Sequence, residues 1–424
     1  MTSSTLASLK PIADSIRVLA MDAVQQANSG HPGMPMGMAD ATAVLWARFL
    51  KFDPQQPDWP DRDLFLLSAC HGSILLYALL HLAGYDLPLA ELQRFRQWGS
   101  HTPGHPEYGD TVGVETTTGP LGQGISNAVG MALAEAWLAA RFNRPEYPLV
   151  DHHTFVVASD GDLMEGVSHE ACSLAGHLGL GKLIVLYDDN GISIDGSTDL
   201  SFTEDVLARF AAYGWHTDRV DGHDMTAVFT ALETARAEAE RPSLIACRTI
   251  IGFGSPHKAG TASAHGEPLG EEEIRLTRER LGLPQEKFWV DPQAYEILGT
   301  AGSQGARRHH AWRALLAQYA AAYPELAAEF ERVMHGRLPD GWQETAMPNF
   351  ESAIATRAAS GQVLNAFAAA VPELLGGSAD LTGSNKTDLK GAADVQRGRF
   401  EGRYLRFGVR EHGMGAIMNG MALH

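Results

Sequence analysis

Asp160 and Asn190, each followed by a glycine, are the residues whose types and spacing most suggest chemistry. Each follows a short β-branched and aromatic run, 154–158 and 182–188, and apolar residues recur at helical spacing over 163–180. Parallel strands joined by a helix end on one edge of a sheet, so the carboxylate of Asp160 and the amide oxygen of Asn190 should meet there. Hard oxygen ligands suit Mg²⁺, which usually shares them with a diphosphate. Taken alone, Asp-Gly and Asn-Gly are also ordinary turn sequences, so the rest of the chain has to decide.

Four histidines lie in loops or at a strand end: His31, His71, His105 and His265. His71 comes where a predicted strand, 63–67, turns into an apolar helix, which is the same kind of position as that of Asp160. Histidine titrates near neutrality and can move protons. An isolated loop histidine can equally be a solvated or hydrogen-bonded residue without a catalytic role, and both interpretations stay open at this point.

Three glycine-rich segments are candidates for binding loops. Residues 30–40 contain two prolines and three glycines, which predicts an irregular loop. Residues 119–124 open into an apolar helix predicted over 125–141, and could offer backbone N–H groups and a positive helix end to a diphosphate. Glycines in that position can also simply let a helix pack close to a sheet. Residues 252–270 form a long segment almost without apolar side chains, as expected of a functional or mobile loop.

Composition narrows the class of protein. The chain has 424 residues, 33 basic against 51 acidic, and a net charge of −18. This balance argues against nucleic acid or an anionic membrane as the main partner, because binding phosphate backbones needs clustered Lys and Arg. The three cysteines have no metal-binding spacing and are expected to be reduced thiols, and no apolar run or signal-peptide pattern stands out. We therefore expect a soluble, cytoplasmic protein.

The order of predicted elements defines the expected architecture. Strands and helices alternate through the first part of the chain, which predicts an α/β fold with a doubly wound parallel sheet. We expect a first domain over 1–335, a Pro- and Gly-rich linker over 336–352, and a second α/β unit over 353–424. The second unit contains too few elements to cover both faces of a parallel sheet, so it is expected to be incomplete.

Eight segments together resemble one family, the thiamine-diphosphate-dependent transketolases. The segments, in family order, are SGHPGMPMG, TPGHPE, GVETTTGPLGQG, the Asp160-Gly161 and Asn190 pair, DDNGISIDG, GFGSPHKAG, GGSADLTGSN and FGVREHGM. The local departures are small: Ser159 and Cys70 stand where the family commonly has glycine-containing sequence, and His412 where it commonly has Phe. The family continues well past the position of His424, so the resemblance implies a second domain that is truncated here.

The resemblance, rather than spacing, implies particular roles. A Mg²⁺ ion (or Ca²⁺) would be held by Asp160, Asn190 and the carbonyl of Ile192. The residues implied to contact thiamine diphosphate are His71, Gly119, Pro120, Leu121, Gly161, Asn190, Ile194, His265 and Asp380. Those implied to contact the substrate are His31, His265, Arg357 and Ser384. Those implied to take part in proton transfer are Glu411, His31, His105 and His265, with Glu411 paired to the ring nitrogen of the aminopyrimidine.

The implied activity is transfer of a two-carbon ketol unit from a ketose phosphate of the xylulose 5-phosphate type to an aldose phosphate of the ribose 5-phosphate type. The cofactor carbanion carries the unit, and the setting would be the pentose phosphate pathway or the Calvin cycle. The family's site lies between two subunits, so a homodimer is implied, with no nucleic-acid or membrane partner. Two alternatives remain: a catalytically silent fragment that binds the cofactor and dimerises, or another thiamine enzyme such as dihydroxyacetone synthase.

Overall fold

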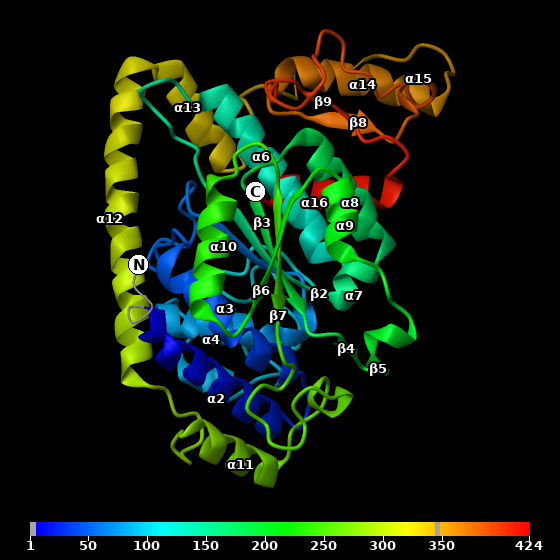
Figure 1. Ribbon diagram of the computed structural model, residues 1–424. Helices are drawn as coiled ribbons and strands as arrows, with labels where there is room; N and C mark the ends of the chain where they lie inside the picture. The colour runs from blue at the N-terminus through cyan, green and yellow to red at the C-terminus, as the bar shows by residue number, and fades with distance from the viewer. Residues whose placement is uncertain (1–5, 344–347) are drawn as a thin grey trace.

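A five-stranded parallel sheet forms the centre of the molecule (Figure 1). The computed structural model describes residues 6–343 and 348–424 of the chain. The strands, in their order across the sheet, are β1 (Leu64–Leu67), β2 (Thr154–Ser159), β3 (Leu183–Asp189), β7 (Ser243–Arg248) and β6 (His216–Asp221). All neighbouring pairs are parallel. The predicted α/β class with a doubly wound parallel sheet is thus confirmed.

Both faces of this sheet are covered by helices, which explains why its central strands are almost wholly apolar. Phe65 and Phe155 point into one buried layer, while Leu66 and Val156 on the same strands point into the other. The helices packed on the first face are α2 (Lys10–Ala27), α3 (Gly33–Arg48), α4 (Ser73–Ala83) and α10 (Met225–Ala237). Those on the second face are α6 (Gln123–Phe142), α8 (Gly166–Leu178), α9 (Val206–Ala212) and α16 (Glu411–Leu423).

The remaining elements of the first part are short or peripheral. They are α5 (Leu89–Leu92), α7 (Asp160–Met164), the hairpin β4 (Ile192–Ser193) and β5 (Gly196–Ser197), α11 (Glu271–Leu281), α12 (Pro292–Ala322) and α13 (Pro324–Met334), with 3₁₀ turns η1 (Cys70–Gly72), η2 (Thr198–Leu200) and η3 (Ala262–Ala264). The long helix α12 runs along one side of the molecule and turns back through α13 (Figure 1). Among the described residues, no helix combines the length and apolar character that crossing a membrane requires.

A second, small unit follows (orange in Figure 1). It consists of α14 (Thr356–Ala370), α15 (Thr382–Asn385) and two parallel strands, β8 (Gly376–Ser378) and β9 (Tyr404–Arg406). The last helix, α16, leaves this unit and packs on α6 and α8 of the first (Figure 1). Part of the predicted linker, 344–347, lies outside the described residues.

Two local predictions were wrong. Residues 30–40 are not an irregular loop throughout, because α3 begins at Gly33 and includes Pro35 in its first turn. The missing N–H of a proline costs nothing there, since the first-turn N–H groups have no partner within the helix. The single helix predicted over 163–180 is two helices, α7 and α8, which meet at Glu165 with extended backbone. Helix α7 starts directly at the end of β2, and the extended backbone of Glu165 separates it from the longer helix.

Candidate active site

Three histidines from separate segments converge beyond the carboxyl ends of β1 and β2. His31 precedes α3, His71 lies in η1 directly after β1, and His265 follows η3. The ring centroids of His31 and His71 are 5.3 Å apart, those of His31 and His265 5.6 Å, and those of His71 and His265 5.1 Å. The structure therefore brings together three of the four histidines named from the sequence.

These histidines are neutral at physiological pH. Burial, together with the nearby His265, Arg96 and His105, lowers the pKa of His31 to about 4. Burial likewise lowers the pKa of His71 and of His265. Among the described residues, Nδ1 of His31 and Nδ1 of His265 are buried without a hydrogen-bond partner. Unpaired buried nitrogens are rare in folded proteins, so these two atoms suit a bound polar ligand.

His105 lies at the exposed side of this group. Burial and the charge of Arg96 lower its pKa, and it in turn acts on His31. Its turn is held against the start of α4, where the hydroxyl of Ser73 donates a hydrogen bond of 2.9 Å to the carbonyl of Gly104. The fourth histidine is thus near the cluster but on its open side.

Asp160 and Asn190 lie on the same sheet edge, as predicted. Strands β2 and β3 are neighbours, and the N–H of Gly191 donates to the carboxylate of Asp160 at 3.2 Å. The hydroxyl of Tyr187 also donates to that carboxylate. Asp160 is buried, and burial raises its pKa to about 6. A carboxylate in such a place is poorly solvated and would be stabilised by a cation.

The side chain of Asn190 is fixed by its neighbours. Its Oδ1 accepts the N–H of Ile192 at 2.8 Å, and its Nδ2 donates to Asp188 at 2.7 Å. Asp188 is fully buried, accepts a hydrogen bond from the hydroxyl of Thr249, and has its pKa raised to about 7 by burial. Sequence reasoning missed this residue, although a charged side chain at the end of a buried β-branched run was a visible signal.

The glycine-rich segment 119–124 lies between these two groups. The thiol of Cys70 donates to the carbonyl of Gly119 at 2.9 Å, on the side of His71. On the other side, a Cβ added to Gly161 would lie 2.9 Å from Cδ1 of Leu121. A Cβ on Gly124 would lie 2.5 Å from Cα of Ser68, so the close-packing interpretation of these glycines also holds.

Among the described residues, no hydrogen bond or ring contact joins the four histidines or Asp160 to the residues predicted in the β4–β5 hairpin or beyond the linker. Ile194, at the tip of the β4–β5 hairpin, is 70% exposed. The residues named from the sequence beyond the linker, Arg357, Asp380, Ser384 and Glu411, are also exposed. Asp380 lines a cavity of about 500 Å³ between α8 and the second unit, and none of the predicted first-domain residues lines that cavity.

No group of three or more His, Cys, Asp or Glu side chains within residues 6–343 and 348–424 is arranged to hold a metal ion. The metal site predicted from the sequence is of a different kind, because it would use one carboxylate, one amide oxygen and one backbone carbonyl. Such a set depends on oxygen atoms from a further ligand to complete an octahedron.

Comparison with known families gives a match over nearly the whole chain. Residues 8–339 match the model described as the thiamine diphosphate binding domain of transketolase, and residues 352–424 match that of its pyrimidine binding domain. The transketolase of Halalkalibacterium halodurans is 56% identical over 415 residues, which are 97% of this chain and 62% of that protein. Transketolase 1 of Escherichia coli is 54% identical over 426 residues, covering 99% of this chain and 64% of its own length.

Comparison with solved structures also finds transketolases. Transketolase from Leishmania mexicana superposes with a TM-score of 0.96 at 51% identity, covering 98% of this chain and 62% of that one. The Pichia stipitis transketolase described as a complex with sedoheptulose 7-phosphate superposes with a TM-score of 0.95 at 46% identity, covering 99% of this chain and 63% of that one. This chain thus spans somewhat less than two thirds of the length of these relatives.

A parallel α/β domain that matches a thiamine diphosphate binding domain, followed by a unit that matches a pyrimidine binding domain, defines the class of thiamine-diphosphate-binding proteins. Within that class, the chain belongs to the transketolase family.

Proposed function

We propose that this chain acts in ketol transfer, moving a two-carbon unit from a ketose phosphate of the xylulose 5-phosphate type to an aldose phosphate of the ribose 5-phosphate type. The observation that carries the proposal is the convergence of His31, His71 and His265 beside the strand ends that bear Asp160 and Asn190. When bound, thiamine diphosphate supplies the carbanion that the reaction needs. The pathway would be the pentose phosphate pathway or the Calvin cycle.

The first-domain residues would hold the diphosphate end of the cofactor. We assign Asp160, Asn190 and the carbonyl of Ile192 to a Mg²⁺ (or Ca²⁺) ion shared with the diphosphate. The burial that raises the pKa of Asp160 supports this, because a cation would remove the cost of a desolvated carboxylate. The other residues proposed to contact the cofactor are His71, Gly119, Pro120, Leu121, Gly161, Ile194 and His265.

The histidines would bind the sugar and move its hydroxyl protons. His31 and His265 are neutral, and each has a buried Nδ1 without a partner among the described residues. A neutral imidazole can accept a proton from a hydroxyl or donate to it, so these atoms suit a polyhydroxylated substrate. His105 would contact the substrate from the open side. Solved Pichia stipitis transketolases are described as complexes with sedoheptulose 7-phosphate and xylulose 5-phosphate.

The second unit would act on the site of another copy. Arg357 and Ser384 would contact the sugar phosphate, Asp380 the cofactor, and Glu411 the aminopyrimidine. All four are exposed in the single chain, which supports a homodimer whose site takes residues from both copies. We place the division between the two domains within 336–352. The free, buried state of Cys70, Cys172 and Cys247 fits a cytoplasmic setting.

A second candidate is a silent fragment that binds the cofactor and dimerises without turnover. The observation that favours it is that Arg357, Asp380, Ser384 and Glu411 are exposed in the single chain, so one copy alone does not bury them in a site.

Calorimetric titration of thiamine diphosphate with Mg²⁺, followed by a coupled assay with xylulose 5-phosphate and ribose 5-phosphate, tests both candidates. Binding with turnover supports ketol transfer, and binding without turnover supports the silent fragment. Absence of binding would overturn both. The Asp160→Ala variant should lose binding, and retained binding would remove Asp160 from the proposed metal site.

A further inference from the structure

Asp162 is a buried carboxylate to which neither the family resemblance nor the proposed function gives a role. It is the third residue of α7 and has no exposed surface. Its Oδ2 accepts the N–H of Ser159 at 2.9 Å and the Ser159 hydroxyl at 3.0 Å. Its Oδ1 accepts the N–H of Gly122 at 2.9 Å and the hydroxyl of Ser68 at 2.7 Å. Four donors from three segments thus surround one side chain.

These three segments are the ones that carry the proposed cofactor contacts. Ser68 follows β1 and comes three positions before His71. Gly122 directly follows the contact residues 119–121, and Ser159 directly precedes Asp160. The oxygen of Ser68 also accepts the N–H of Ile125 at 2.9 Å, which fixes the first turn of α6. One carboxylate therefore links the ends of two strands and the start of a helix.

A carboxylate satisfies all four of these donors at once. It offers two acceptor oxygens and no donor, so it can take two hydrogen bonds on each side. Hydrogen bonds to an ionised acceptor are shorter and stronger than neutral ones. The contacts leave little room for adjustment, because a Cβ on Gly122 would lie 2.8 Å from the Ser168 hydroxyl oxygen. An amide in place of the carboxylate would turn an NH₂ group toward a backbone N–H on one side, and the serine hydroxyl there would have to turn round to accept from it.

We propose that Asp162 is a positioning residue that holds the three cofactor-binding segments in fixed mutual positions before the cofactor arrives. The inference rests on the proposed function for the identity of those segments. The competing explanation is a local one, in which Asp162 only caps α7 through Ser159. The two explanations differ in whether Asp162 also matters to segments outside α7.

Hydrogen exchange of the cofactor-free chain distinguishes the positioning role from the helix-cap role. In the Asp162→Asn variant we expect faster exchange in peptides covering 68–72, 119–125 and 159–164. Faster exchange confined to 159–164 would reduce Asp162 to a helix cap and overturn the proposal. Should Asp162→Asn not fold, Ser68→Ala serves instead. Faster exchange is then expected over 159–164, which the Ser68 hydroxyl contacts through Asp162, and unchanged exchange there would count against the proposal.

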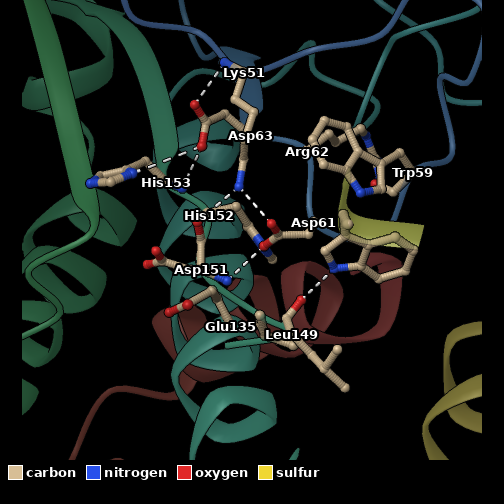
Figure 2. A network of polar contacts seen from close by, with 12 residues as sticks. Lys51, Trp59, Asp61, Arg62, Asp63, Glu135, Leu149, Asp151, His152 and His153 are labelled. Atoms are coloured by element: carbon tan, nitrogen blue, oxygen red, sulfur yellow. Dashed lines mark hydrogen bonds and ion pairs between the residues drawn. The ribbon is translucent and has the colours of Figure 1, made fainter. Parts of the chain in front are cut away.

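Asp63 directly precedes β1, at the opposite edge of the same sheet, and provides a matched control whose contacts are shown in Figure 2. It is also buried, and its carboxylate accepts the N–H of Lys51 and the N–H of His153, each at 2.8 Å. Asp63→Asn removes a comparable link between two segments, far from the strand ends that bear Asp160. It should leave exchange over 119–125 unchanged, and an equal increase in both variants would overturn the proposal.

Cofactor affinity gives a second readout. With thiamine diphosphate and Mg²⁺ in the calorimeter, Asp162→Asn should weaken binding roughly tenfold or more, while Asp63→Asn should change it less than about twofold. If the unaltered chain and Asp162→Asn bind thiamine diphosphate equally well, the inference about Asp162 is overturned and the proposed function stands. Failure of the unaltered chain to bind would overturn the proposed function, and the exchange experiment would still decide the role of Asp162.

Discussion

At the scale of single residues, the site combines neutral histidines with a desolvated carboxylate. His31, His71 and His265 come from three separate segments, and burial lowers the pKa of each. Asp160 shows the opposite shift for the same reason, because burial always disfavours the charged form. A site with these properties suits the polar ligand and the cation proposed above.

His31 should make the stability of the chain depend on pH. Its pKa falls from 6.5 to about 4 on folding, so between these values the unfolded chain binds more protons. Stability contributed by the neutral ring is therefore complete above pH ~6.5 and is lost as the pH falls toward ~4. We expect His31→Gln to show a shallower fall in melting temperature across this window. His310→Gln, an exposed control on α12, should keep the original slope, and equal slopes in all three proteins would contradict the assignment.

Asp160 should show a conflict between stability and binding. Burial raises its pKa, which means that the folded, ligand-free chain disfavours its charge at neutral pH. Asp160→Asn should then leave the melting temperature of the cofactor-free chain unchanged or higher at pH 7, and should remove Mg²⁺-dependent cofactor binding. Scanning calorimetry with and without the cofactor measures both effects. A lower melting temperature without cofactor would show that the charge stabilises the fold instead.

At the scale of elements, helix packing depends on backbone contact between α6 and α16. A Cβ on Gly420 would lie 1.9 Å from the carbonyl oxygen of Asn127, and one on Gly130 would lie 2.0 Å from that of Ile417. Two glycines thus let the last helix, which follows the second unit, lie directly on the first domain (Figure 1). This contact fixes the direction in which α16 presents Glu411 at its first turn.

Gly420→Ala tests the crossing. The added methyl would meet backbone that has to move, so we expect a loss of about 1–3 kcal/mol in the free energy of unfolding. Gly415 lies on the same helix with nothing within 4 Å of an added Cβ. Gly415→Ala should therefore stabilise the chain by about 0.5–1 kcal/mol through helix propensity alone. Urea denaturation of both variants gives the comparison. If Gly420→Ala leaves the free energy of unfolding unchanged, α6 and α16 can move apart to fit the methyl group without cost.

The sequence indicated most of these elements, and the errors have identifiable causes. Periodicity and β-branched runs located β1, β2 and β3 within one or two residues, because buried parallel strands read as apolar runs. The start of α3 was missed because prolines and glycines were taken as helix breakers, although Pro35 lies in a first turn that tolerates it. The break at Glu165 was missed because apolar spacing continues across it. Asp162 was missed because its partners, Ser68 and Gly122, are distant in sequence.

At the scale of the whole molecule, the proposed site is divided between two groups of residues that a single chain keeps apart. The histidines and Asp160 lie at the carboxyl edge of the sheet, while Arg357, Ser384 and Glu411 lie exposed on the second unit and on α16. The exposure of these polar residues in one chain is explained if a second, symmetry-related copy uses them. In a two-fold dimer each copy would then give its second unit to the site of the other.

Mixing two defective variants tests this arrangement. Asp160→Ala removes the proposed metal ligand, and Glu411→Ala removes the proposed pyrimidine partner, so neither homodimer should hold the cofactor normally. Co-expression in equal amounts gives mixed dimers as roughly half of the population, and each mixed dimer contains one intact site, so roughly a quarter of the normal binding capacity should return. The control is a single chain that carries both substitutions, Asp160→Ala and Glu411→Ala. It should recover no cofactor binding. Calorimetric titration counts the sites. If each chain builds its site from its own residues, the mixture recovers nothing either, because every chain in it carries one defect.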